Sequence, residues 1–214
     1  MSDRFAAWWL VLVGVLVGGA IGASFPPDRV IDMMGEEGAV EQFTALGFFL
    51  VAPCVWLLRR AGDPPQTLAA LSVVFLAFCA RELDWHKVWT GTSVLRVSYF
   101  LGPAPVQHKL VALLVLATFA LAVGWLVVRH ARDWWRGLRA HEAVAISVAA
   151  FLFTIVLAKG LDRSYSILTE DFALAVPMWA KAVVNAVEEC LELTLTLIAL
   201  LALWQNRRRE GDGR

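Results

Sequence analysis

The sequence has few of the residues from which soluble catalytic and metal sites are usually built. Its 214 residues include only three Cys, and no two of them stand in a CxxC pair. Neither a disulfide framework nor a thiolate zinc site is therefore predicted. The chain has no GxSxG motif and no ordered Ser, His and Asp series, which argues against a nucleophilic hydrolase. It also lacks a basic patch suited to nucleic acid, so we expect no nucleic-acid partner.

Charged residues are scarce as well, and long apolar runs take their place. The chain is 59% hydrophobic with a mean hydropathy of +0.63 and contains ten Trp. This composition excludes an ordinary soluble domain. Six segments approach the roughly 20 residues needed to cross a bilayer: 5–23, 41–58, 67–85, 110–128, 143–161 and 178–204. We predict a single all-α transmembrane domain over 1–214, a polytopic bundle of six transmembrane helices.

The distribution of arginine predicts how this bundle is oriented. Arginines gather in alternate connections and at the C-terminus, including Arg59, Arg60 and the run Arg207–Arg209. The segment 129–142 between two apolar runs adds four more arginines. Because cytoplasmic loops carry an excess of Lys and Arg, we expect both termini in the cytoplasm and the chain in a bacterial inner membrane.

The first apolar segment carries a stripe of small residues. Gly14, Gly18 and Gly22 repeat at four-residue spacing, which allows another helix to approach closely. We expect this face to pack inside the bundle; formation of a homodimer is the alternative.

The most informative stretch is 181–196, KAVVNAVEECLELTLT, because it places acids within an apolar segment. On a helix, Lys181, Asn185, Glu188 and Glu192 fall on one face, with Glu189 beside it. A carboxylate in the hydrocarbon costs several kcal/mol unless it meets a cation, a proton, a metal or water. This face is therefore expected to look inward.

Other charged residues gather on the same side of the membrane. The run RELDWHK at 81–87 puts Glu82 and His86 at i and i+4 if the third segment stays helical to residue 85. Counted along the helices, Glu82 lies about 23 Å and Glu188 about 24 Å into their segments, so the two are predicted to be level. The full set of candidates for an outward-facing acidic pocket is Glu41, Arg81, Glu82, Asp84, His86, Asp162, Arg163, Lys181, Asn185, Glu188, Glu189 and Glu192.

Three short motifs allow a comparison with known proteins. RELDWHK, the LDR at 161–163 and the EECLEL at 188–193 together resemble a set of bacterial polytopic inner-membrane proteins of unknown activity. The resemblance implies a multi-helix membrane fold and supplies no activity. The three-His set of ceramidase-like and progestin-receptor-like membrane hydrolases is missing, which excludes that group.

Three hypotheses for function remain open at this stage. The first is an outward-facing pocket that binds a cation or a lipid headgroup, with transport as one use of such binding. The second is a membrane enzyme acting on a lipid or lipid-linked substrate, with Zn, Mn or Fe held by a subset of His86, Glu82, Asp162, Glu188 and Glu192. The third is a structural or assembly subunit, alone, as a homo-oligomer or with a partner membrane protein, whose charges form a salt-bridge network.

Overall fold

The computed structural model describes residues 3–35, 38–88, 94 and 97–208, and every regular element in these ranges is helical. The long helices are α1 (Ala6–Ser24), α3 (Ala39–Leu57), α4 (Pro65–Glu82), α7 (Val106–Arg139), α8 (Ala143–Ser166) and α9 (Met178–Arg208). Short elements connect them: η1 (Asp3–Phe5), α2 (Pro27–Met34), α5 (Trp85–Val88), α6 (Val97–Leu101) and the π-helical turn η2 (Ile167–Asp171).

Four stretches of the described chain are long and apolar enough to cross a membrane: Asp3–Ser24, Pro27–Leu57, Val106–Arg139 and Ala143–Asp171. Their outer faces carry large apolar side chains in the open, such as Leu16, Leu114 and Val156, which are 60%, 68% and 71% exposed. Contact of so many apolar side chains with water is unfavourable, whereas their contact with lipid is not. The helices α4 and α9 stand outside this group.

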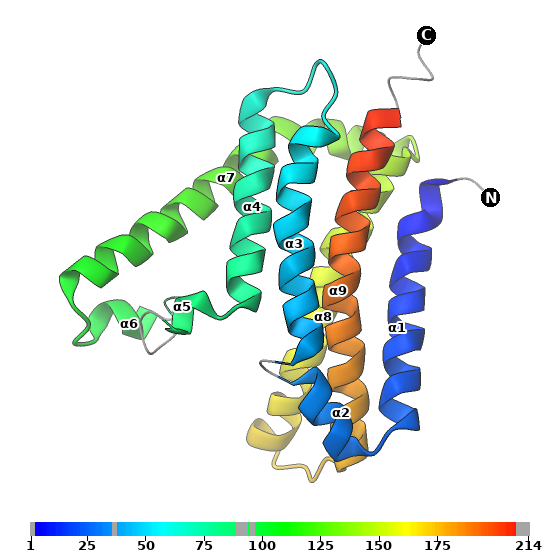
Figure 1. Ribbon diagram of the computed structural model, residues 1–214, viewed down its shortest axis with the longest axis vertical. Coiled ribbons are helices and arrows are strands. Elements are labelled where there is room, and N and C mark those ends of the chain that lie inside the picture. The colour runs from blue at the N-terminus through cyan, green and yellow to red at the C-terminus, as the bar shows by residue number, and fades with distance from the viewer. Residues whose placement is uncertain (1–2, 36–37, 89–93, 95–96, 209–214) are drawn as a thin grey trace.

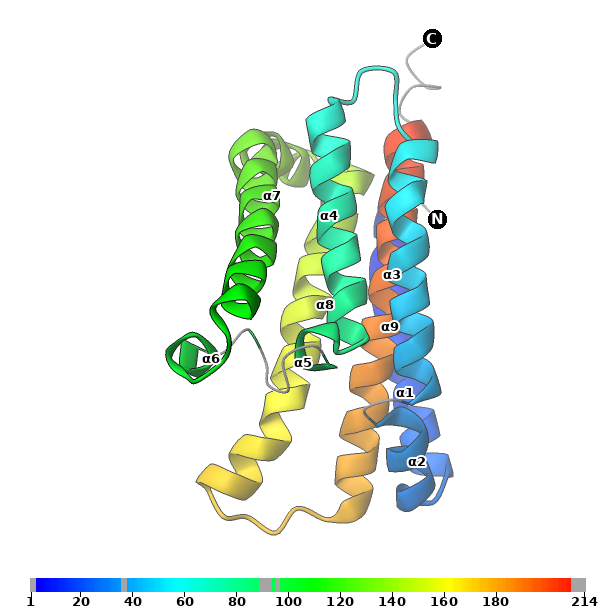
Figure 2. The same ribbon diagram turned by 60° about the vertical axis from the view of Figure 1, so that its left-hand side comes forward.

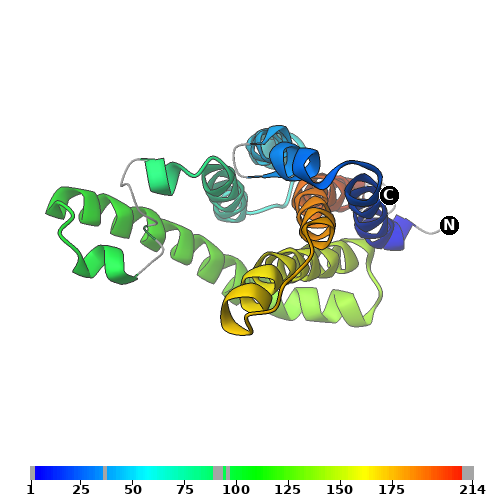
Figure 3. The same ribbon diagram turned by 90° about the horizontal axis from the view of Figure 1, so that it is seen from below.

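The helix α9 lies at the centre of the bundle, between α1, α2, α3 and α8 (Figures 1 and 3). Six of its buried residues belong to three apolar clusters. Leu195 and Ala199 pack with Phe48 and other α3 and α4 residues, Leu191 and Ile198 pack with α1 and α8, and Ala182 and Ala186 pack with α2. A helix enclosed on several sides can carry charged groups without exposing them to lipid.

The glycine stripe of α1 packs against α9, as expected for internal packing. Gly14, Gly18 and Gly22 are buried. A Cβ added to Gly18 would stand 2.6 Å from the Ala186 carbonyl oxygen, and one added to Gly22 would stand 2.6 Å from the Val183 Cα. These two backbones approach so closely only because the glycines have no side chain.

Both described ends of the chain lie at the same end of the bundle (Figure 1). The Gln205 side-chain amide donates a hydrogen bond to the Asp3 carbonyl over 2.9 Å, and the Ser147 hydroxyl donates to the Gln205 Oε1 over 2.7 Å. The Arg207 guanidinium donates to the Leu57 carbonyl over 2.7 Å. The start of α1, the end of α3, the start of α8 and the end of α9 are thus tied together at one level.

The predicted ends of the third, fourth and fifth segments were wrong. The fifth was expected to end at residue 161, but α8 continues to Ser166. The segment 129–142 was expected to be a loop, but α7 continues through it to Arg139, because Arg, Trp and Leu end an apolar run without breaking a helix. The third segment was expected to stay helical to residue 85, but α4 ends at Glu82. Asp84 adopts a φ of 49°, a conformation that Asp tolerates better than most residues, and the chain turns there before α5.

Candidate functional site

Three helices bring acidic residues together inside the bundle. The helix α9 supplies Glu188, Glu189 and Glu192, while Glu82 comes from the last turn of α4 and Glu41 from the first turn of α3. The helix α3 packs against both α4 and α9, and Arg81 of α4 reaches Glu192 of α9, so the five glutamates lie near one another. We call them the carboxylate cluster.

Arg81 pairs with two glutamates of this cluster. Its Nη2 lies 2.6 Å from Glu192 Oε1 and 3.5 Å from Glu82 Oε1. Glu82 and Glu192 are each only 5% exposed, whereas the Arg81 side chain is 32% exposed. One guanidinium therefore balances two buried carboxyl groups, one from its own helix and one from α9.

Arg81 also brings Glu82 and Glu192 close to each other, because Oε1 of each carboxyl group lies within 3.5 Å of the same Arg81 Nη2. Two buried carboxylates so close together repel each other unless a proton or another cation lies beside them.

Lys159 of α8 is the second cation of the cluster, and the sequence analysis did not include it among the candidates. Its Nζ lies 2.9 Å from Asp162 Oδ2 and 3.8 Å from Glu192 Oε1. Lys159 and Asp162 stand at i and i+3, a spacing that indicates a local pair. That spacing was the available signal, while the approach of Lys159 to Glu192 depends on the packing of α8 against α9.

Glu188 and Glu189 point in different directions from α9. Glu188 interacts electrostatically with Asp162, Glu192, Lys159 and Arg81, which places it on the side of α8. Glu189 interacts with Glu192, Glu188, Glu41 and Glu82, all of them acids. Its Oε2 is buried and has no hydrogen-bond partner within the described part of the chain.

Several candidates lie away from the cluster. Lys181 sits over the ring of Tyr165, with its Nζ 5.0 Å from the ring centroid. Asn185 donates a hydrogen bond to the Met34 carbonyl over 2.9 Å and ties α9 to α2. Asp84 pairs with Lys87 over 2.7 Å. Arg163 is exposed. The polar residues predicted to share one face of α9 therefore contact different neighbouring helices, because α9 is enclosed on several sides.

One expected relation differs from the structure, and another stays a prediction. Arg81 brings Glu82 close to Glu192, while the equal depth expected of Glu82 and Glu188 stays a prediction. Glu82 and His86 do not share a continuous helix, because the turn at Asp84 separates α4 from α5. The side chain of His86 lies outside the described part of the chain.

The metal hypothesis gains no support from the described residues. Within them, no group of three or more His, Cys, Asp or Glu side chains is arranged to hold a metal ion. For Glu192 the contacts show why it is not arranged as a metal ligand. Arg81 and Lys159 both approach its Oε1, so this carboxylate already has cationic partners.

Chemically, the arrangement can hold positive charge. The described ion pairs give Glu82, Glu192 and Asp162 two shared cations, Arg81 and Lys159, and Glu189 faces other acids. No protein-family model, no curated protein and no solved structure matches the chain.

Proposed function

We propose that this chain is a six-helix bacterial inner-membrane protein that binds a small cation at the carboxylate cluster. The observation that carries the proposal is Glu189, whose buried Oε2 finds no hydrogen-bond partner in the described chain, while the strongest charges acting on it are the acids Glu41, Glu82, Glu188 and Glu192. Such a group in a low-dielectric site requires a proton or another cation nearby.

The proposal includes α4 and α9 among the spanning helices. The helix α9 is enclosed by α1, α2, α3 and α8, and α4 lies between α3 and α7. Their charged residues then need no contact with lipid, which is the condition under which intramembrane acids are tolerated. The four more apolar stretches surround them, with the basic ends of the chain in the cytoplasm.

The three motifs behind the resemblance to bacterial inner-membrane proteins also support a common site. RELDWHK contributes Arg81 and Glu82, LDR contributes Asp162, and EECLEL contributes Glu188, Glu189 and Glu192. We propose that proteins sharing these motifs share the cluster.

The test is release of protons when a cation binds. Full-length protein in detergent and weak buffer receives NaCl, CaCl2 or ethanolamine hydrochloride, with choline chloride at equal ionic strength as the reference. A cation that displaces protons from the carboxyls acidifies the solution, which a pH-indicator dye measures. We expect saturable release from the parent for at least one probe.

Glu189→Gln is the test variant, and Glu170→Gln is its matched control. Glu170 is exposed in the connection between α8 and α9, so the same chemical change there should leave the release unchanged. We expect Glu189→Gln to lose the release. Equal release from the parent and Glu189→Gln, or none beyond the choline reference, would overturn the proposal.

Transport would appear as dissipation of a pH or sodium gradient across proteoliposomes.

One observation favours a second candidate, a structural or assembly subunit. Arg81 joins α4 to α9, and Lys159 joins α8 to α9, so the same charges form a network between three helices. If no probe binds and every variant that breaks these pairs only lowers the unfolding temperature, the network holds the helices in register, alone or together with a partner membrane protein.

A further inference from the structure

The last part of α7, residues 129–139, differs from the rest of that helix in composition and direction. The apolar first part of α7 slants away from the bundle, whereas this last part runs across the end of the bundle (Figures 1 and 2). It carries Arg129, Arg132, Arg136 and Arg139. We call residues 129–139 the crosswise segment.

The crosswise segment is fixed to the bundle on one side. The Trp134 Nε1 donates a hydrogen bond to the Ala145 carbonyl of α8 over 3.0 Å. Gly137 is buried, and a Cβ added there would stand 2.6 Å from Glu142 Oε2 and 3.2 Å from the Ala145 Cβ. At the start of the segment, the His130 Nε2 lies 2.9 Å from the Thr67 hydroxyl at the beginning of α4.

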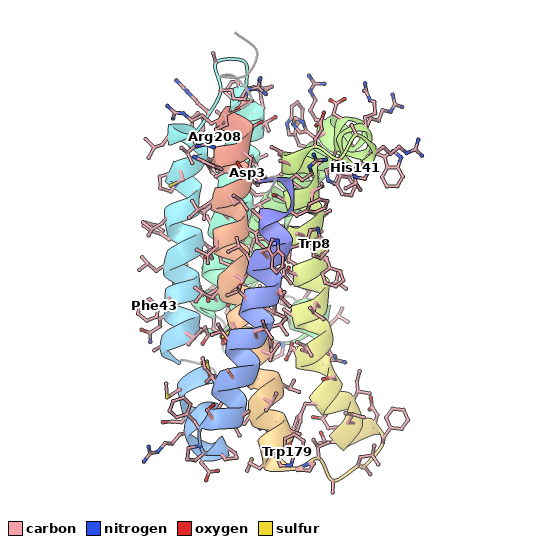
Figure 4. The ribbon with its side chains drawn as sticks, turned by 90° about the vertical axis from the view of Figure 1, so that its right-hand side faces the viewer. Asp3, Trp8, Phe43, His141, Trp179 and Arg208 are labelled. Atoms are coloured by element: carbon pink, nitrogen blue, oxygen red, sulfur yellow. The ribbon has the colours of Figure 1, made fainter. Side chains whose placement is uncertain are left out.

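These contacts leave the opposite side of the segment open. All four arginines are exposed, and Trp135 is 50% exposed. The Arg139 guanidinium lies 5.2 Å from the centroid of the Trp135 ring. Figure 4 views this helix end-on beside His141, with nitrogen-tipped side chains pointing away from the bundle.

Positive charge exceeds negative charge on this face. Asp133 is the acid within the crosswise segment, and it pairs with Arg136 over 2.7 Å. Arg129, Arg132 and Arg139 have no acid of the segment left to pair with. Arg207 and Arg208 lie at the same end of the bundle, where Arg208 is 3.7 Å from Asp3.

We propose that the crosswise segment lies in the headgroup layer and binds the phosphate groups of anionic phospholipids. A helix parallel to the membrane plane, basic on its outer side and with an exposed Trp, has the composition of an interfacial helix. Guanidinium groups form paired hydrogen bonds with phosphate oxygens, and basic clusters next to spanning helices attract anionic lipid.

The experiment counts lipids held by the purified chain. Full-length protein in dodecylmaltoside is mixed with dioleoyl phosphatidylglycerol or dioleoyl phosphatidylcholine, passed through a sizing column and analysed by native mass spectrometry. We expect the parent to retain several-fold more phosphatidylglycerol than phosphatidylcholine. The excess should fall with rising NaCl, since exposed charges are screened.

Three variants separate charge from structure. The triple change of Arg129, Arg132 and Arg139 to Gln should lose the phosphatidylglycerol excess, whereas the same three changed to Lys should keep most of it. The matched control is Arg29→Gln with Arg163→Gln, two exposed arginines near the other end of the bundle, and it should behave as the parent.

Equal phosphatidylglycerol retention by the parent and the Gln triple variant would overturn the proposal. An equal loss in the control would also overturn it, since any exposed arginine would then suffice. If an RNA oligonucleotide binds the parent and displaces the lipid at equal concentration, the face is a nucleic-acid surface and the proposal fails. Should the triple variant not purify, Arg132→Gln alone is measured, and an unchanged lipid count contradicts the proposal.

Discussion

Arg81 lowers the free-energy cost of burying two glutamates. Its guanidinium meets Glu82 and Glu192, which are each 5% exposed, while its own side chain keeps 32% of its surface open. Partial exposure lowers the cost of removing the cation from water, and the two carboxyls gain a partner that they cannot obtain from lipid. The positioning of Arg81 is thus a condition for placing acids on the central helix.

We expect Arg81→Gln to lower stability strongly. Removing one partner of a buried ion pair leaves an uncompensated charge and costs about 3–5 kcal/mol. The variant should unfold at a clearly lower temperature than the parent in the same detergent. Adding Glu192→Gln should recover part of the loss, because it removes one of the acids that Arg81 balanced.

Arg163→Gln serves as the control for this prediction. Arg163 is exposed on α8 near Asp162, so its change should leave the unfolding temperature within error of the parent. Independent losses in Arg81→Gln and Glu192→Gln that simply add in the double variant would show that the two side chains do not interact.

At the scale of elements, α1 and α9 approach each other through glycines, and a larger residue at Gly18 would push the two helices apart. A Cβ at Gly18 would stand 2.6 Å from both the Ala186 oxygen and the Val187 Cα, which are backbone atoms and cannot turn aside. Gly19, one residue later, has no atom within 4 Å of its added Cβ. The two neighbouring glycines therefore offer a matched pair.

Gly18→Ala should destabilise the protein, and Gly19→Ala should not. Ala is favoured over Gly in a helix by about 1 kcal/mol, so Gly19→Ala is expected to raise the unfolding temperature or leave it unchanged. Gly18→Ala gains the same propensity but must separate two packed helices, which costs about 1–3 kcal/mol. Thermal unfolding in detergent measures both variants, and a Gly18→Ala as stable as Gly19→Ala contradicts the described packing.

At the scale of the whole molecule, one end of the bundle gathers the basic residues and both described ends of the chain. The contacts of Gln205 with Asp3 and Ser147 hold the starts of α1 and α8 next to the end of α9. The carboxylate cluster lies away from that end, where α4 ends and α3 begins. The molecule is therefore polarised along its length, and this polarity is the basis for its proposed orientation.

We expect a green fluorescent protein fused to the C-terminus to fluoresce in a bacterial host. The basic end should stay in the cytoplasm, where that reporter folds. Alkaline phosphatase inserted in the exposed connection 172–176 should be active, since it would reach the periplasm. Fluorescence from a reporter in 172–176, combined with a dark C-terminal fusion, would reverse the orientation.

The local sequence was enough to find most helices and the five glutamates of the carboxylate cluster. Apolar runs predicted the starts of α1, α3, α4, α8 and α9 to within a few residues, because a membrane-length apolar run leaves few alternatives. The ends were less certain. The sequence did not indicate that Asp84 would turn the chain or that α7 would continue to Arg139. Polar residues at the end of an apolar run are compatible with both a helix and a turn, so the local sequence does not decide between them.

By itself the sequence determined that the chain is helical, that several of its segments suit a membrane, and that its acids and arginines gather at opposite ends. These properties follow from composition and spacing. Only the tertiary structure decided that α9 is central, that Arg81 brings Glu82 and Glu192 together and that Lys159 approaches Glu192. The rotation and inclination of each helix come from side chains interlocking between segments far apart in the chain, and no local pattern records that interlocking.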